Sequence, residues 1–217
     1  MTTYPAATIE AFRSISTASV SDALQALGVH GHVPSTIRLL AGEKVVGPAL
    51  TVKEGPSTEA VPPSHALDTI EGAEPGGVMV IDLGGESDVA AWGGLMTAGA
   101  VAKGLEGVVL DTCARDLTEI RRDFPGFTVF ARGTSPATTV GRFATISAGE
   151  PVELDGVEVR QDDLVVADAD GVVVIPAEHV DATLAGALEI EEREREQTRL
   201  ILSSGSLAEG LAAYNRI

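Results

Sequence analysis

Cysteine and aromatic residues are scarce in this chain, and each scarcity excludes a class of structure. Cys113 is the only cysteine, so neither an intrachain disulfide nor a cysteine-based zinc site can form. Aromatic residues make up 4% of the sequence, whereas hydrophobic residues make up 44%. That hydrophobic content is typical of a globular protein rather than a disordered one. The core must therefore be built mainly from valine, leucine, isoleucine and alanine.

Positive charge is also scarce. Lysine and arginine number 15 against 32 aspartate and glutamate residues, which gives a formal net charge of −17. This balance argues against nucleic acid and anionic membranes as partners, because too few cations are present to neutralise phosphates. An anionic substrate would need a local positive group or a metal ion. The sequence also lacks a signal-peptide pattern and a transmembrane-length apolar run. We therefore expect a cytoplasmic protein with no nucleic-acid or membrane partner.

The order of apolar runs predicts an α/β fold. Short runs of strand type cover residues 78–81, 107–110 and 128–131. A run of small residues at 95–103 has helical character, and Gly104 follows it as a left-handed C-cap. The resulting strand–helix–strand–helix–strand order is the βαβαβ pattern of a parallel sheet. Two further apolar runs flank Asp168–Gly171 and predict a β-hairpin.

Both ends of the chain are predicted to be helical. Residues 8–27 fit one or two helices, the second capped by Ser19 or Ser21, and Ser64 is a candidate N-cap for a short helix that follows it. A long helix is expected from residue 178 to about 203, and a last helix from 207 to 214. Because the middle of the long helix is polar nearly all round, it should project from the body or lie in a subunit contact. We expect one domain over residues 1–217, with helices 178–214 in oligomer contacts.

The candidate chemistry follows the strand at 107–110. Asp111, Asp116 and Glu119 lie within nine residues of one another, and carboxylates without nearby histidine suit Mg²⁺ or Mn²⁺. Asp116 and Glu119 would equally serve as caps of a short helix. The guanidinium of Arg115 is planar and can donate two parallel hydrogen bonds to a substrate carboxylate. Alternatively, Arg115 forms a structural ion pair with Asp111 or Asp116. The amides after Gly93-Gly94 would bind an anion, although close helix packing explains these glycines too.

The same residues resemble a known family, the RraA-like proteins, which include class II 4-hydroxy-4-methyl-2-oxoglutarate aldolases. The similarity rests on Gly94 followed by twenty residues, Arg115-Asp116 and then Glu119. Other similar stretches are TASVSDAL (17–24), VGPALTV (46–52), PGGVMVID (75–82), FARGTSP (130–136) and DLVVADADGVVVIP (163–176). The family often has Gly-Glu-Leu where this chain has Gly93-Gly94-Leu95, a difference that bears on substrate choice.

The resemblance implies a compact α/β/α-type sandwich with the swivelling β/β/α fold, assembled as a homotrimer or hexamer. It implies that Asp116 binds Mg²⁺ or Mn²⁺ directly, that Asp111 and Glu119 hold waters of the metal, and that Asp111 helps to move protons. Arg115 would bind the substrate, and the amides of Leu95 and Met96, next to Gly94, would hold the pyruvate carboxylate. The implied activity is cleavage of 2-keto acids to pyruvate, with oxaloacetate decarboxylation as a side activity. The alternative is a regulator that binds and inhibits a ribonuclease.

Overall fold

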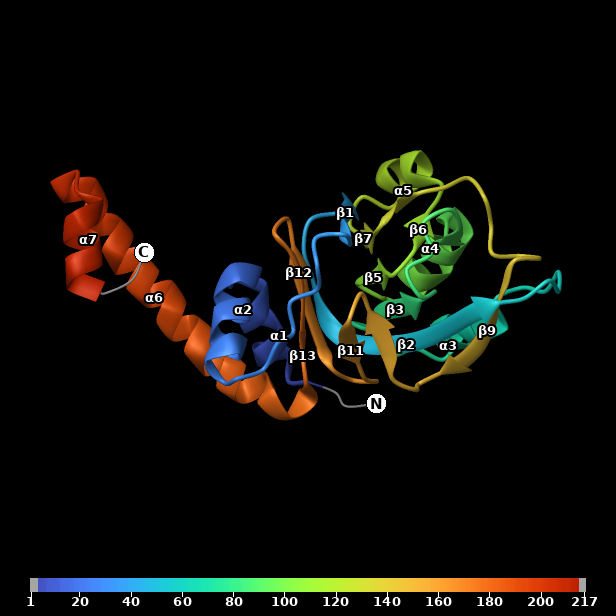
Figure 1. Cartoon of the computed structure of the whole chain (residues 1–217), viewed down its shortest axis with the longest axis horizontal. Coiled ribbons are helices and arrows are strands. Elements are labelled where there is room, and N and C mark those ends of the chain that lie inside the picture. The colour runs from blue at the N-terminus through green and yellow to red at the C-terminus, as the bar shows by residue number, and fades with distance from the viewer. Residues whose placement is uncertain (1–3, 215–217) are drawn as a thin grey trace.

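A curled mixed sheet forms the centre of the molecule (Figure 1). The computed structural model describes residues 4–214. Its main sheet runs in the order β1 (Arg38–Ala41), β7 (Thr128–Ala131), β5 (Gly107–Leu110), β3 (Val78–Asp82), β2 (Val45–Pro56), β12 (Leu164–Asp168) and β13 (Gly171–Ile175), and β9 (Phe143–Ala148) also pairs with β2. β2, β3, β5 and β7 are parallel neighbours. The predicted α/β class and βαβαβ order are thereby confirmed.

Helices cover one face of the parallel strands. They are α3 (Ser64–Glu71), α4 (Gly94–Ala102) and α5 (Leu117–Asp123). Alternation along the strands decides which residues meet them: Met79 and Ile81 of β3 pack on this face with Ile70 of α3 and Ile120 of α5. A buried parallel strand needs apolar residues on both faces, which explains the uninterrupted apolar runs.

The opposite face is closed by the sheet itself. Val78 and Val80 of β3 pack against Val165 and Val174 of the β12–β13 hairpin and against a small hairpin of β10 (Val152–Leu154) and β11 (Val157–Val159). β2 makes this curl possible, because its first residues pair with β12 and its later residues pair with β3 and β9. The second half of the chain is thus β-rich, as predicted.

Terminal helices pack on the outside of the β12–β13 hairpin. They are α1 (Ala6–Arg13), α2 (Thr17–Ala26) and α6 (Val180–Ser204). The distal part of α6 and α7 (Leu207–Tyr214) extend away from the body (Figure 1). Among residues 4–214, no helix is both long and apolar enough to cross a membrane.

Two predicted helix caps are wrong. Ser16, rather than Ser19 or Ser21, caps α2, and its side chain accepts a hydrogen bond from the amide of Ser19. The N-cap of α3 is Pro63, with no side-chain cap, and Ser64 is the first helical residue. Both corrections move a boundary by a few residues, which is the least certain feature of a local pattern.

Candidate active site

Two short parallel strands place the candidate residues side by side. After β5 the chain forms β6 (Cys113–Ala114), which lies between β4 (Ala90–Trp92) and β8 (Gly133–Thr134). β4 leads directly into α4, and β6 leads into α5 through Arg115 and Asp116. The amide of Arg115 donates to the carbonyl of Trp92 over 2.9 Å. This pairing sets the turn after β4 against the turn after β6.

Asp116 faces the first turn of α4. Its carboxylate Oδ2 accepts a hydrogen bond from the amide of Gly94 at 3.0 Å and lies 3.6 Å from Nε of Arg115. The residue is left-handed, with φ of 58°, a conformation that aspartate tolerates better than most residues. Asp116 is the N-cap residue of α5, as the capping interpretation predicted, but its side chain makes no capping hydrogen bond there. Arg115 pairs with Asp116 rather than with Asp111.

Gly93 makes this approach possible. A Cβ atom at Gly93 would lie 2.7 Å from Oδ2 of Asp116 and 3.1 Å from the side chain of Arg115. Any larger residue would push the carboxylate and the guanidinium away from the turn. The glycine pair therefore serves a polar contact as well as helix packing.

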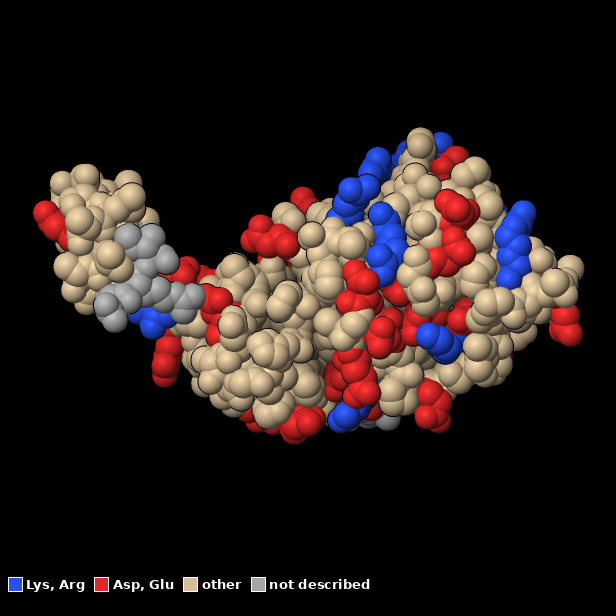
Figure 2. Space-filling view, in the orientation of Figure 1, with Lys and Arg blue, Asp and Glu red and all other residues tan. Residues whose placement is uncertain are grey.

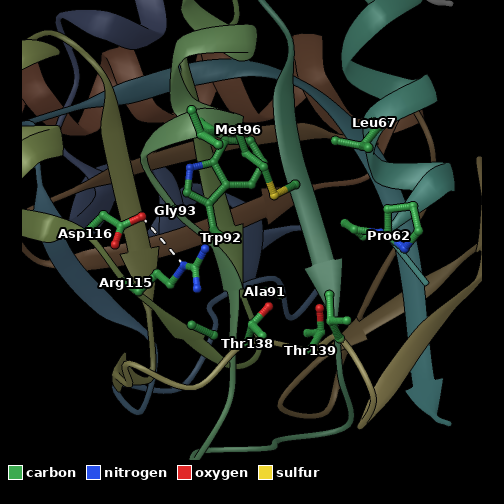
Figure 3. Close-up of a pocket in the computed structure, with 14 residues that line it drawn as sticks. Pro62, Leu67, Ala91, Trp92, Gly93, Met96, Arg115, Asp116, Thr138 and Thr139 are labelled. Atoms are coloured by element: carbon green, nitrogen blue, oxygen red, sulfur yellow. Dashed lines mark ion pairs between the residues drawn. The ribbon is translucent and has the colours of Figure 1, made fainter. Parts of the chain in front are cut away.

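A cavity opens on each side of the Arg115–Asp116 pair. The apolar lobe has a volume of about 250 Å³ and is lined mainly by Pro62, Pro63, Leu67, Trp92, Met96 and Val140. The polar lobe, about 430 Å³, is lined mainly by Thr118, Glu119, Thr134 and Ser135. Figure 3 shows Trp92 and Met96 between the ion pair on one side and Leu67 and Pro62 on the other. Met96 and Glu119 were predicted at the site. The sequence analysis missed Pro62, Leu67 and Val140, because they come from distant segments without any shared motif.

The donor set suits a hard cation held largely by water. Asp116 and Arg115 each have side chains that are 42% exposed, so their mutual attraction is weak and leaves both available to a ligand. Within residues 4–214, no group of three or more histidine, cysteine, aspartate or glutamate side chains is arranged to hold a metal. A single carboxylate in an open polar cavity fits Mg²⁺, which commonly keeps several waters and one or two carboxylates. Asp116 could hold such an ion, with Glu119 in the same lobe.

Asp111 lies in a different cavity. It lines a polar cavity of about 320 Å³ with Lys53, Asp82 and Arg132. Its Oδ1 accepts from Nε of Arg132 at 2.6 Å; burial raises the pKa of Asp111, and the Arg132 contact opposes that rise. The structure therefore does not bring Asp111 to Asp116, because β6 carries the chain away between them. The proton-moving role of Asp111 stays a prediction.

The other predicted residues are at the site. Gly94, Leu95 and Met96 form the first turn of α4, where amides have no acceptor within the helix; that of Gly94 binds Asp116. Leu95 is 90% exposed at the cavity mouth. Cys113 is buried and donates to the carbonyl of Ser87, in keeping with its predicted packing role.

Comparisons with known proteins agree on one family. A family model described as RraA-like, Aldolase/RraA, matches residues 17–174. A Halalkalibacterium halodurans protein named "Putative 4-hydroxy-4-methyl-2-oxoglutarate aldolase" is 36% identical over 170 residues, covering 77% of this chain and 76% of the relative. Protein DlpA of Legionella pneumophila is 31% identical over 193 residues, covering 88% of this chain but only 31% of DlpA.

A solved structure gives the same result for the fold. Streptomyces coelicolor RraAS2, described as an unusual member of the RNase ES inhibitor RraA protein family, superposes with a TM-score of 0.81 at 27% identity and covers 91% of this chain and 98% of that one. The family-model match spans well over half of the sequence, and it includes β2 to β13 and the whole Arg115–Asp116 site. This chain therefore belongs to the RraA-like family.

Proposed function

We propose that this protein is a divalent-metal-dependent aldolase that cleaves 2-keto acids of the 4-hydroxy-4-methyl-2-oxoglutarate type to pyruvate and also decarboxylates oxaloacetate. The observation that carries the proposal is the meeting of one carboxylate, one guanidinium and a helix N-terminus at a single cavity. The names of several relatives as aldolases support the same class of reaction.

In this proposal each residue of the site has its own role. Asp116 would hold Mg²⁺ or Mn²⁺, and Glu119, which lines the same lobe, would help to hold its waters. When bound, such an ion supplies Lewis-acid stabilisation for charge that develops on a keto oxygen. Arg115 binds the substrate's carboxylate and keto side and adds a second positive group where negative charge grows. The amides of Leu95 and Met96 bind the pyruvate carboxylate at the N-terminus of α4.

Both proposed reactions give the same fragment. Both reactions break the C3–C4 bond, one bond removed from the 2-keto carbon. C4 leaves in an aldehyde, a ketone or CO₂, and the electron pair of the bond stays on the pyruvate fragment as an enolate. Protonation of that enolate at carbon gives pyruvate. One site that stabilises the enolate therefore serves both reactions.

Removal of the metal is the experiment that tests this function. We expect pyruvate release from oxaloacetate and from 4-hydroxy-4-methyl-2-oxoglutarate to stop in EDTA and to return with excess Mg²⁺ or Mn²⁺. Released pyruvate is measured with lactate dehydrogenase and NADH, after dialysis of the protein against chelator. A folded protein that releases no pyruvate with any divalent ion would contradict the proposal.

Gly93→Ala tests the packing of the site. The new methyl group would overlap Oδ2 of Asp116 and the Arg115 side chain, so we expect kcat/KM for oxaloacetate to fall about 10- to 100-fold, as when a contact that orients a metal ligand is lost. Gly126→Ala is the matched control, because its Cβ would meet no atom within 4 Å. Equal activity of the two variants would show that the close approach is unimportant.

The regulator remains the second candidate. It is favoured by the net charge of −17 and by the acidic strip down the middle of the face in Figure 2, since a basic ribonuclease would be attracted to such a surface. If the protein binds a ribonuclease and releases no pyruvate from either substrate, this function is favoured over the aldolase.

We further propose a trimeric or hexameric assembly in which α6 and α7 contact other subunits. The projection of these helices from the body (Figure 1) and the exposure of Leu202, Leu207 and Leu211 support this role.

A further inference from the structure

The charges of the two lobes are unequal. Arg115 is the only basic side chain among the described residues that line either lobe. In the proposed function it binds the 2-keto acid end of the substrate. The polar lobe presents Glu119 and Asp116, which would repel a second carboxylate. Apart from Arg115, the described residues that line the apolar lobe include no cation to bind a second carboxylate.

The apolar lobe has the composition of a hydrocarbon site. Met96 lies beside the ring of Trp92, and Leu67 lies on the opposite side of the lobe (Figure 3). Trp92 is buried and held by a 2.8 Å hydrogen bond from its Nε1 to Thr97. Trp92 also stacks on Phe127 with ring centroids 5.9 Å apart. These contacts hold Trp92 in place, so this wall of the apolar lobe is fixed before any ligand binds. At ~30 Å³ for each water-sized group, the lobe has room for about eight of them.

The rim of this lobe leaves apolar surface in water. Leu67 is 37% exposed and Val140 is 38% exposed, although both line the cavity. A substrate substituent that covers them would remove apolar surface from water, which favours binding. The lobe adjoins the Arg115–Asp116 pair, so one small molecule can reach both.

We infer that the apolar lobe selects 4-hydroxy-2-oxo acids whose C4 carries an alkyl or aryl group in place of a second carboxylate. This inference rests on the proposed aldolase function and changes the preferred substrate from a dicarboxylate to a monocarboxylate. It ranks a monocarboxylate with a butyl or phenyl group above 4-hydroxy-2-oxoglutarate and above 4-hydroxy-4-methyl-2-oxoglutarate.

The reaction is balanced without a further reactant. The 4-hydroxyl group loses its proton and becomes the carbonyl of an aldehyde as the C3–C4 bond breaks. The electron pair of that bond stays with C3 as the pyruvate enolate, and C3 takes up a proton. The products are pyruvate and an apolar aldehyde, which leaves through the apolar lobe.

Arg142 is the cation that could reverse this ranking. It is exposed, and its Nη1 donates to the carbonyl of Thr138 at the cavity wall over 3.0 Å. If Arg142 turned to bind a second carboxylate, dicarboxylates would be preferred, and Arg142→Met would abolish that preference.

The experiment compares kcat/KM for matched substrates with Mg²⁺ present. The pair is 4-hydroxy-2-oxo-octanoate, with a butyl group at C4, and 4-hydroxy-2-oxoglutarate, with a carboxylate there. We expect the butyl substrate to be favoured at least about tenfold, and each methylene added to a shorter alkyl group to raise kcat/KM up to about fourfold, the equivalent of ~0.8 kcal/mol. Exchange of the pyruvate methyl protons with D₂O reports the enolate step that all these substrates share.

Leu67→Arg places a cation at the rim of the apolar lobe. We expect it to lower the ratio of kcat/KM for the butyl substrate to kcat/KM for 4-hydroxy-2-oxoglutarate at least about tenfold. Leu188→Arg is the matched control, because Leu188 is 46% exposed on α6 and lines neither lobe; it should leave the ratio unchanged.

The possible outcomes distinguish a failure of this inference from a failure of the proposed aldolase function. Proton exchange together with faster cleavage of the dicarboxylate would overturn the apolar preference and leave the aldolase in place. No proton exchange with any divalent ion would overturn both.

Discussion

Asp116→Asn is expected to lower kcat/KM for pyruvate release about 10³-fold, equivalent to ~4 kcal/mol of transition-state stabilisation. The carboxylate of Asp116 accepts a hydrogen bond from the first turn of α4. It is also the proposed direct ligand of the metal. Asparagine has nearly the same shape and tolerates the left-handed conformation with φ of 58°. Its amide oxygen can still accept from Gly94. The variant therefore removes the charge and leaves the local geometry.

Binding of Mn²⁺ gives this prediction a second readout. We expect calorimetric titration to detect Mn²⁺ binding to the wild type and little or none to Asp116→Asn. Asp123→Asn is the control, since Asp123 lies on the same helix and pairs with Arg122 away from the cavity. Full activity of Asp116→Asn would remove Asp116 from the reaction, and loss of activity with unchanged Mn²⁺ binding would remove it from the metal.

Glu54→Gln is expected to stabilise the protein by about 3 kcal/mol above pH 7 and to have little effect near pH 4.5. Glu54 is 2% exposed, and neither carboxylate oxygen has a hydrogen-bond partner among the described residues. Burial raises the pKa of Glu54 to about 7 from an ordinary value of 4.5. Glutamine keeps the shape of the side chain and cannot ionise.

The sign follows from the protons bound in each state. Below pH 4.5 Glu54 is protonated in both the folded and the unfolded chain, so it adds no dependence on pH. Between pH 4.5 and 7 the folded chain binds more protons, and stability falls as the pH rises. Above pH 7 the full cost of about 2.5 pKa units is reached, at ~1.36 kcal/mol for each unit.

Denaturant unfolding at pH 4.5 and pH 8 measures this difference. Trp92 is the only tryptophan and is buried, so its fluorescence reports the transition. Glu59→Gln is the control, because Glu59 is exposed and its replacement should change stability by less than ~0.5 kcal/mol. A Glu54→Gln effect that is the same at both pH values would mean that Glu54 has a partner or ordinary solvation in solution.

The parallel core of the fold was readable from the sequence. The apolar runs at 78–81, 107–110 and 128–131 became β3, β5 and β7, because a strand buried on both faces has apolar residues at every position. Gly104 has φ of +75° and follows α4 as predicted. The spacing from Gly94 to Arg115-Asp116 was also informative, since α4, β5 and β6 return the chain to the edge where α4 begins.

Tertiary pairing decided the rest. Asp111 is four residues from Arg115 in the sequence, yet β6 pairs with β4 and carries the chain to another cavity between them. The apolar lobe gathers residues from 62–67, 90–96 and 138–140, which no local pattern relates. Glu54 lies on β2 where β9 pairs alongside it, and its carboxylate has no hydrogen-bond partner among the described residues. Local sequence patterns predicted the parallel strands and the main helices, because these depend on residues close together in the chain. Contacts between distant segments decide which side chains share a cavity and which charge is buried without a partner. Only the folded structure determines those contacts.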